Sequence, residues 1–225
     1  MPGHPRPYAP KDESYKDPDK TIFVGIAAYR DTRCAKTLYN MFTKAKYPDR
    51  LRIGLVWQND VTDADCVEGY CKLMGHDPNP AGPPKKAPVA GLPPEPGAQA
   101  DADMSRNCPH FHQIKVHRVT HKLAVGPTFG RHLQSNMIED EEFCMQSDSH
   151  MDYVDHWDEK MVEQWGMTEN EYAVITTYVN RLEDLNRNIN GRYEVPHLCQ
   201  MEFLPNGLPR NIQAKSVMNL SRPKL

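Results

Sequence analysis

The chain has 225 residues, a formal net charge of −3 at pH 7 and an isoelectric point near 6.4. This length suits one domain with a real core, and the scattered Lys and Arg residues give no electrostatic case for binding nucleic acid or an anionic membrane. No stretch approaches the roughly 18 consecutive apolar residues that a membrane helix needs. The first twenty residues lack the apolar centre of a signal peptide. We therefore expect no nucleic-acid partner, no transmembrane segment and a cytoplasmic location.

Six cysteines are spread widely along the chain, at positions 34, 66, 71, 108, 144 and 199. An even number permits disulfides, but the chain length and the lack of a secretion signal favour free thiols. Cys34 and Cys144 sit within apolar patterns. We expect both to be small core residues.

The first half of the chain begins with a polar segment, residues 1–20, that predicts a flexible lead-in. The continuous apolar run over 21–29 is typical of a buried parallel strand. Helical spacing of apolar residues over 33–47 predicts a helix, and 51–57 predicts a second strand. A strand, a helix and a strand in this order form a βαβ unit.

Residues 75–109 interrupt this pattern, because they hold nine of the twenty prolines and little that a core could bury. We interpret the segment as a disordered or polyproline-like insertion. A solvated surface loop is favoured over a docking segment.

Strands and helices alternate again after the insertion. We expect strands over 113–119, 143–146 and 172–179, and helices over 127–138 and 157–165. This alternation predicts an α/β fold with a mostly parallel sheet, in a domain spanning 21–215 that is followed by a tail, 216–225. Such sheets bind ligands beyond the carboxyl ends of their strands, where Asp31, Gln58 and Asp148 are expected.

The most informative segment is Asp148-Ser149-His150, at the end of the strand predicted over 143–146. Side chains two apart on an extended segment point to the same side, so Asp148 and His150 can converge while Ser149 faces away. A carboxylate and an imidazole can hold a divalent cation against a substrate phosphate. A capping Asp148 with an ordinary surface His150 fits the pattern equally well.

Two further segments are candidates for binding a phosphorylated ligand. Gly126-Pro127-Thr128 opens a predicted helix, whose free N–H groups and Arg131 could receive a diphosphate. The pattern alone favours a simple helix start. Tyr29, Arg30 and Asp31 close the first strand and could stack on a base, meet a phosphate and accept from a uracil or ribose, although Asp31 is equally suited to cap a helix.

A zinc site is disfavoured, although Cys66, Cys71, Cys108, His110 and His112 invite one. No Cys-x-x-Cys pair is present, and the insertion separates the candidates. The sequence contains neither a Walker loop nor a Gly-x-Gly-x-x-Gly motif nor a serine nucleophile elbow.

Several ordered blocks resemble the hydroxyproline-directed N-acetylglucosaminyltransferase family. They are IFVGIAAYRD (22–31), Cys34 with Thr37 and Leu38, IGLVWQ (53–58), AVGPT (124–128) with Arg131, FCMQSDSHM (143–151) with Trp157 and Asp158, NEYAVITTY (170–178) and VPHLC (195–199). The resemblance spans residues 21–215 apart from the insertion. It implies a GT-A type, Rossmann-like α/β/α sandwich.

The resemblance also implies a chemistry. The donor would be UDP-N-acetylglucosamine (UDP-GlcNAc), with Mn²⁺ or Mg²⁺ held by Asp148 and His150, and the acceptor a hydroxyproline-type protein hydroxyl, such as that on a ubiquitin-ligase adaptor. Transfer would retain the anomeric configuration. Donor contacts map onto a set of edge residues: Tyr29, Arg30, Asp31, Arg131, Gln146 and Ser149.

One departure from the family pattern concerns the acceptor side. Such enzymes draw acceptor contacts, and often a further metal ligand, from later in the domain, and residues 216–225 do not resemble that continuation. The alternative to an active transferase is therefore a truncated, non-catalytic protein that binds a UDP-sugar or a partner.

Overall fold

The computed structural model describes residues 13–76, 108–177, 179, 188–189, 192–193 and 195–217. The chain divides into two compact units, with a boundary between Val162 and Glu163. Most of the predicted insertion (77–107), the first twelve residues and the last eight lie outside the described part.

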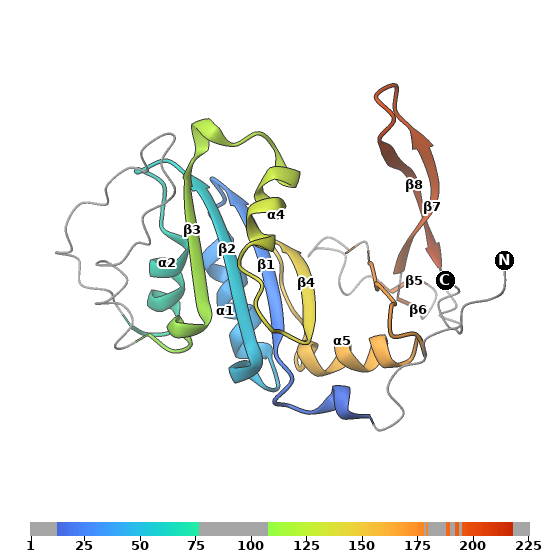
Figure 1. The fold of residues 1–225 in the computed structure, drawn as a ribbon, viewed down its shortest axis with the longest axis horizontal. Helices are drawn as coiled ribbons and strands as arrows, with labels where there is room; N and C mark the ends of the chain where they lie inside the picture. The colour runs from blue at the N-terminus through green and yellow to red at the C-terminus, as the bar shows by residue number, and fades with distance from the viewer. Residues whose placement is uncertain are drawn as a thin grey trace. The chain divides into compact units, whose positions relative to one another are not determined.

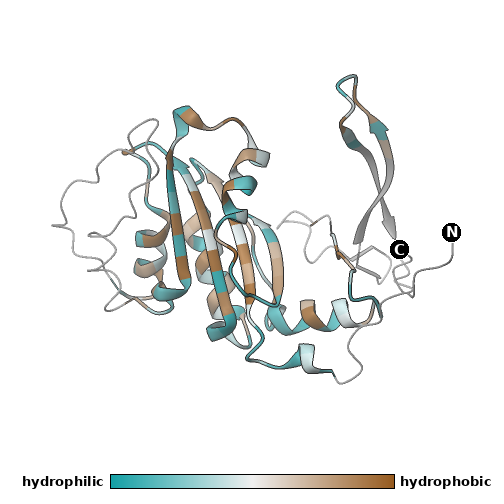
Figure 2. Cartoon of the chain, viewed as in Figure 1, coloured by the Kyte–Doolittle hydropathy of each residue, from teal (hydrophilic) through white to brown (hydrophobic). Residues whose placement is uncertain are grey.

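The first unit is built on a four-stranded parallel sheet in the order β3-β2-β1-β4 (Figure 1). The strands are β1 (Ile22–Tyr29), β2 (Leu51–Asn59), β3 (Ile114–Thr120) and β4 (Phe143–Asp148). β1 and β2 are almost wholly buried and carry the apolar centre of the unit (Figure 2). The expected α/β fold with a parallel sheet is confirmed, because continuous apolar runs need cover on both faces.

Four helices of eight residues or more accompany this sheet within the described residues. They are α1 (Cys34–Lys44), α2 (Cys66–Leu73), α4 (Pro127–Ser135) and α5 (Trp157–Gly166), and short 3-10 turns occupy Ser14–Lys16, Pro48–Arg50, Phe111–Gln113 and His121–Leu123. α1 packs beside α2, whereas α4 lies on the opposite face of the sheet (Figure 1). The predicted helices at 33–47, 127–138 and 157–165 are confirmed with slightly different ends.

Glycines allow α4 to approach the sheet closely. A Cβ at Gly25 of β1 would lie 2.8 Å from Gln134 Oε1, and one at Gly130 of α4 would lie 3.0 Å from Ala27 Cβ. A side chain at Gly25 would displace the buried Gln134 amide, and one at Gly130 would crowd Ala27. The glycine at 130 therefore lets the first turn of α4 lie close to β1.

Two secondary-structure predictions need correction. Helix α2 was not predicted. Asp65 caps this helix by accepting hydrogen bonds from the N–H groups of Val67 and Glu68. The Asp-x-x-Glu pattern at 65–68 was a signal from which the helix start could have been predicted. The strand predicted over 172–179 is wrong, since residues 172–177 and 179 are not in a strand. Tyr172 and Val174 are more than 70% exposed, and β-branched residues favour strands only where they can pack.

The prediction of free thiols is also wrong. Cys34 is bonded to Cys66 and Cys71 to Cys108, with Cα–Cα distances of 5.3 and 5.4 Å, and all four residues are buried. Cys144 is a free thiol but is exposed, not a core residue. The zinc interpretation of Cys66, Cys71 and Cys108 is excluded because each is disulfide-bonded. Cysteine spacing does not reveal which side chains the packing of α1 against α2 brings together.

Part of the predicted lead-in is structured, because Tyr15 in the 3-10 turn Ser14–Lys16 is buried.

The second unit contains two described antiparallel pairs of strands. β5 (Asn188–Ile189) pairs with β6 (Arg192–Tyr193), and β7 (Val195–Phe203) pairs with β8 (Pro209–Val217). Among the described residues, no helix has the length and apolar character needed to cross a membrane.

A buried carboxylate anchors the start of α5 to the loop between α1 and β2. Asp158 is fully buried and accepts hydrogen bonds from the N–H groups of Lys46 and Tyr47 and from Arg50 Nε. Arg50 is itself buried, and its Nη2 lies 2.9 Å from Asp158 Oδ2. The neighbouring Trp157 donates its indole N–H to Met41 O at 2.9 Å. The Trp157-Asp158 block thus has a structural role.

Substitution Asp158→Ala should lower the free energy of unfolding by about 3–5 kcal/mol, because it leaves the Arg50 guanidinium buried without its counter-charge. Urea denaturation followed by circular dichroism measures this loss. Glu159→Ala is the matched control, since it removes only a partly exposed carboxylate paired with Lys46. Similar losses for both variants would contradict the anchoring role of Asp158.

Candidate functional site

The parallel sheet gathers the predicted site residues at one edge. β1 pairs in register with β2 through Tyr29 and Gln58, and with β4 through Ala27 and Asp148. The carboxyl ends of the strands and the segments that follow them therefore meet on one side of the unit, where open α/β sheets bind their ligands.

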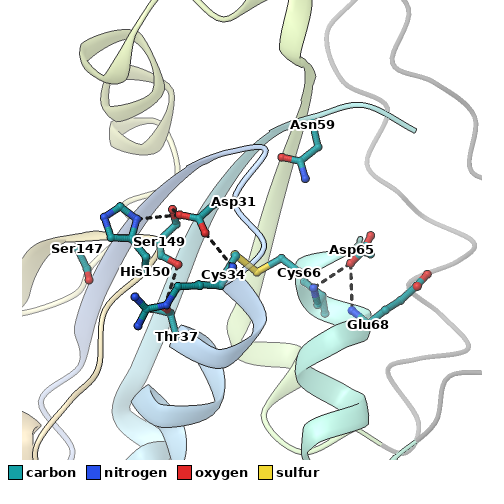
Figure 3. The surroundings of a disulfide bond; sticks show 12 residues. Asp31, Cys34, Thr37, Asn59, Asp65, Cys66, Glu68, Ser147, Ser149 and His150 are labelled. Carbon is teal, nitrogen blue, oxygen red and sulfur yellow. Dashed lines mark hydrogen bonds and ion pairs between the residues drawn. A yellow bond between two sulfur atoms is a disulfide. The ribbon is translucent and has the colours of Figure 1, made fainter. Parts of the chain in front are cut away.

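Asp31 links the segment after β1 to the segment after β4. Its Oδ2 accepts from Ser149 Oγ at 2.7 Å and from His150 Nδ1 at 2.8 Å, while Oδ1 accepts from the N–H of Arg33 at 2.8 Å (Figure 3). Asp31 stabilises the turn before α1 without being its N-cap, which is Arg33.

These hydrogen bonds determine the charge state of Asp31. Burial by itself would raise the pKa of Asp31, but donation from Ser149, the Arg33 N–H and His150 outweighs burial and lowers this pKa below its ordinary value. Asp31 is therefore an ionised acceptor at neutral pH. His150, whose side chain is 56% exposed, must then donate its Nδ1 proton to the carboxylate.

The alternation at the end of β4 is as predicted. Asp148 and His150 are exposed, whereas Ser147 and Ser149 are buried. The hydroxyl of Ser147 lies 2.6 Å from the phenol oxygen of Tyr153, and that of Ser149 bonds to Asp31. β4 ends at Asp148, and Ser149 and His150 lie in the turn that follows it. The exposed carboxylate and imidazole therefore flank the buried Ser149, whose contacts hold the segment.

The segment after β4 is fastened to α1. Thr37 is buried, its hydroxyl lies 2.9 Å from Ser149 O, and it accepts from the N–H of Met151 at 3.0 Å. Asn40 donates to Asp152, and Lys44 Nζ donates to Tyr153 O. This role of α1 was not predicted from the sequence, although the polar Thr37 on the apolar face of a helix was a possible signal.

Arg131 reaches the same edge from α4. Its Nη2 lies 3.6 Å from Asp148 Oδ1, and both side chains are at least half exposed. Such a pair contributes little to stability, so both groups can turn to a ligand at small cost. α4 begins at Pro127 after Gly126, as predicted. The structure thus brings two separately predicted candidates together.

Arg30 and Gln146 already have protein partners. Arg30 has a positive φ of 49° and donates from Nε and Nη2 to Asp63, at 2.9 Å each. Gln146 Nε2 donates to Gly25 O at 2.9 Å. Tyr29 is 56% exposed at the end of β1. Asp63 was not predicted, and its separation of 33 residues from Arg30 left no local signal.

Asp148 and His150 are the residues at this edge that could hold a divalent cation, as partial ligands. In the described part of the chain, no group of three or more His, Cys, Asp or Glu residues is arranged to hold a metal ion. Two protein ligands suffice where a diphosphate and water complete the coordination, as for Mg²⁺ in nucleotide sites. A ligating histidine commonly donates its other ring N–H to a carboxylate, as His150 does to Asp31.

The comparisons with known proteins identify a family. A family model described as Glycosyltransferase (GlcNAc) matches residues 21–223. The chain belongs to this glycosyltransferase family. No curated protein and no solved structure was found to match it. Membership supports a role in glycosyl transfer, with a sugar donor and an acceptor, and agrees with the α/β fold.

The stability that Asp31 contributes should depend on pH. Because its folded-state pKa is lowered, this contribution is complete above the unfolded-state pKa of about 4 and is lost as the pH falls through the folded-state value. The difference in free energy of unfolding between the wild type and Asp31→Asn should therefore shrink from pH 6 toward pH 3 in urea titrations. Thr37→Val, which removes an uncharged group, should show the same loss at both pH values. A constant Asp31→Asn difference would contradict the lowered pKa.

Proposed function

We propose that this glycosyltransferase-family chain transfers N-acetylglucosamine from UDP-GlcNAc to a protein hydroxyl, with a hydroxyproline-type acceptor and a divalent cation. The observation that carries the proposal is the joint exposure of Asp148 and His150 at the carboxyl edge of β4, inside the region that the family model matches. The family description supports the sugar, and the sequence resemblance supports the donor and the acceptor class.

The edge residues divide into groups with different freedom to meet the donor. Tyr29 offers an exposed ring for stacking on a base, and the half-exposed Arg131 offers a charge for a diphosphate. Arg30 would have to leave Asp63 to do so, and Gln146 would have to leave Gly25. We assign Tyr29 and Arg131 the direct donor contacts.

Ser149 and Asp31 lie deeper than the other candidate donor contacts. The hydroxyl of Ser149 is turned into the protein and bonded to Asp31, and both residues are largely buried. Their part in donor binding is to keep His150 and the segment after β4 in place.

Asp148 and His150 would hold Mn²⁺ or Mg²⁺, and when bound such an ion acts as a Lewis acid on the departing diphosphate. The protein side of the reaction is binding and orientation. The bond from the anomeric carbon to the diphosphate breaks, the bond to the acceptor oxygen forms, and the proton of the acceptor hydroxyl passes to the departing diphosphate. Arg131 adds positive charge beside Asp148, where negative charge develops on the leaving group.

Incubation of the chain with UDP-GlcNAc and Mn²⁺ should release UDP, and a hydroxyproline-containing peptide should gain one N-acetylhexosamine by mass spectrometry, whereas the matching proline peptide should not. Asp148→Ala should lower kcat/KM by at least ~100-fold, about 3 kcal/mol, by removing a cation ligand. Asp140→Ala is the control, since this exposed carboxylate precedes β4 at the other end of the strand.

The outcomes separate the competing functions. Binding of UDP without turnover would contradict the transferase and support a non-catalytic UDP-sugar-binding protein. Equal effects of Asp148→Ala and Asp140→Ala would contradict the assignment of Asp148.

A further inference from the structure

We propose that Asp31 is a positioning residue that determines which ring nitrogen His150 presents to the donor site. This inference rests on the proposed function and deepens it. The sequence suggested that Asp31 contacts a uracil or a ribose. The structure indicates a different role for Asp31, because its carboxylate already accepts hydrogen bonds from neighbouring residues of the protein.

The hydrogen bonds of Asp31 leave little capacity for a ligand. An ionised carboxylate has about four acceptor positions, and Ser149, His150 and the Arg33 N–H occupy three of them. The Asp31 side chain is only 18% exposed. Since a carboxylate only accepts, the proton between it and His150 belongs to Nδ1, so the nitrogen that can be unprotonated and face a ligand is Nε2.

The backbone on both sides of this contact is held independently. Thr37 bonds to the main chain of Ser149 and Met151, the two neighbours of His150. The disulfide at Cys34 lies next to the turn that carries Asp31 (Figure 3). The imidazole can therefore rotate only about its own side-chain bonds, and the Asp31 contact stops that rotation. Partners of this kind typically change metal affinity about 10–100-fold.

The first measurement is the tautomer of His150 in the metal-free protein, by ¹⁵N NMR of histidine-labelled chain. The wild type should show Nδ1 protonated and Nε2 unprotonated. Asp31→Asn should give a mixture of tautomers, while Asp152→Asn should leave the wild-type pattern. Asp152 is a matched control because it lies on the same segment as His150 but contacts the side chains of Asn40 and, at 3.8 Å, Arg33, and not the imidazole. A wild-type ring protonated at Nε2 alone would overturn the proposal without any variant.

The second measurement compares UDP binding with Mn²⁺ and with EDTA by calorimetry. Asp31→Asn should weaken Mn²⁺-dependent binding at least about tenfold and metal-free binding less than about twofold. Asp152→Asn should change neither by more than about twofold. Equal losses with and without the metal would make Asp31 a direct nucleotide contact and overturn the proposal. If the wild type does not bind UDP, the proposed function fails, and the tautomer still decides the inference.

A different observation carries a second inference: we infer that the chain folds in an oxidising compartment, in place of the cytoplasmic location expected from the sequence. Helix α2 has eight residues, too few to be stable alone in water, and it is tied at both ends. Cys66 at its start is bonded to Cys34, and Cys71 near its end to Cys108. Thiols in the cytosol are kept reduced.

Each of these bonds requires an oxidant in the folding compartment. In thiol–disulfide exchange, the two thiols of each pair give up two electrons and two protons to the disulfide of an oxidant, which is reduced to two thiols. The four residues are at most 7% exposed in the folded chain. Their burial shields the finished bonds from soluble reductants.

Rapid alkylation of protein taken from its source cells, followed by non-reducing peptide mapping, tests this inference. Mass spectrometry should find Cys34 linked to Cys66 and Cys71 linked to Cys108, with Cys144 alkylated as the internal control for a free, exposed thiol. Alkylation of all four paired cysteines before reduction would overturn it.

Discussion

Parallel pairing of β1 with β2 on one side and β4 on the other is the constraint on which the rest of this structure depends. Three parallel strands must end at the same edge, so the segments that follow them are brought together although Gln58 and Asp148 lie far apart in the sequence. The buried apolar faces of β1 and β2 hold this register, because a slip of one residue would move each side chain to the opposite covered face and disrupt its packing there. The position of the candidate site is thus a consequence of core packing.

Polar contacts then fix the positions of the segments that follow the strands. Asp31 and Asp158 are both carboxylates that accept several N–H or hydroxyl groups, and each joins a segment near α1 to one that follows β4. Asp158 is enclosed with Arg50 and acts as an anchor. Asp148 and Arg131, by contrast, remain half exposed and weakly paired. Asp31 and Asp158, whose oxygens already accept several hydrogen bonds, therefore shape the site. Asp148 and Arg131, which are half exposed, are the residues able to contact a ligand.

The disulfides add a covalent constraint to the same region. Cys34 opens α1 shortly after Asp31, and its bond to Cys66 connects that turn to α2. Asp65, the N-cap of α2, is in turn paired with Arg118 on β3. The turn that carries Asp31 is therefore connected through the Cys34–Cys66 disulfide to α2, and through the Asp65–Arg118 ion pair to β3.

The sequence by itself determined the parallel α/β unit, the order of its strands along the chain and the exposure of Asp148 and His150 on either side of a buried Ser149, because the alternation of apolar and polar residues is a local property. It did not predict α2, the disulfides, the Arg30–Asp63 pair or the role of Asp31, and it predicted a strand over 172–179 that is not there. Each of these depends on which distant side chains become neighbours, or on whether a packing partner exists. Only the tertiary structure decides such contacts, because the energies of burial, pairing and cross-linking arise between segments far apart in the chain.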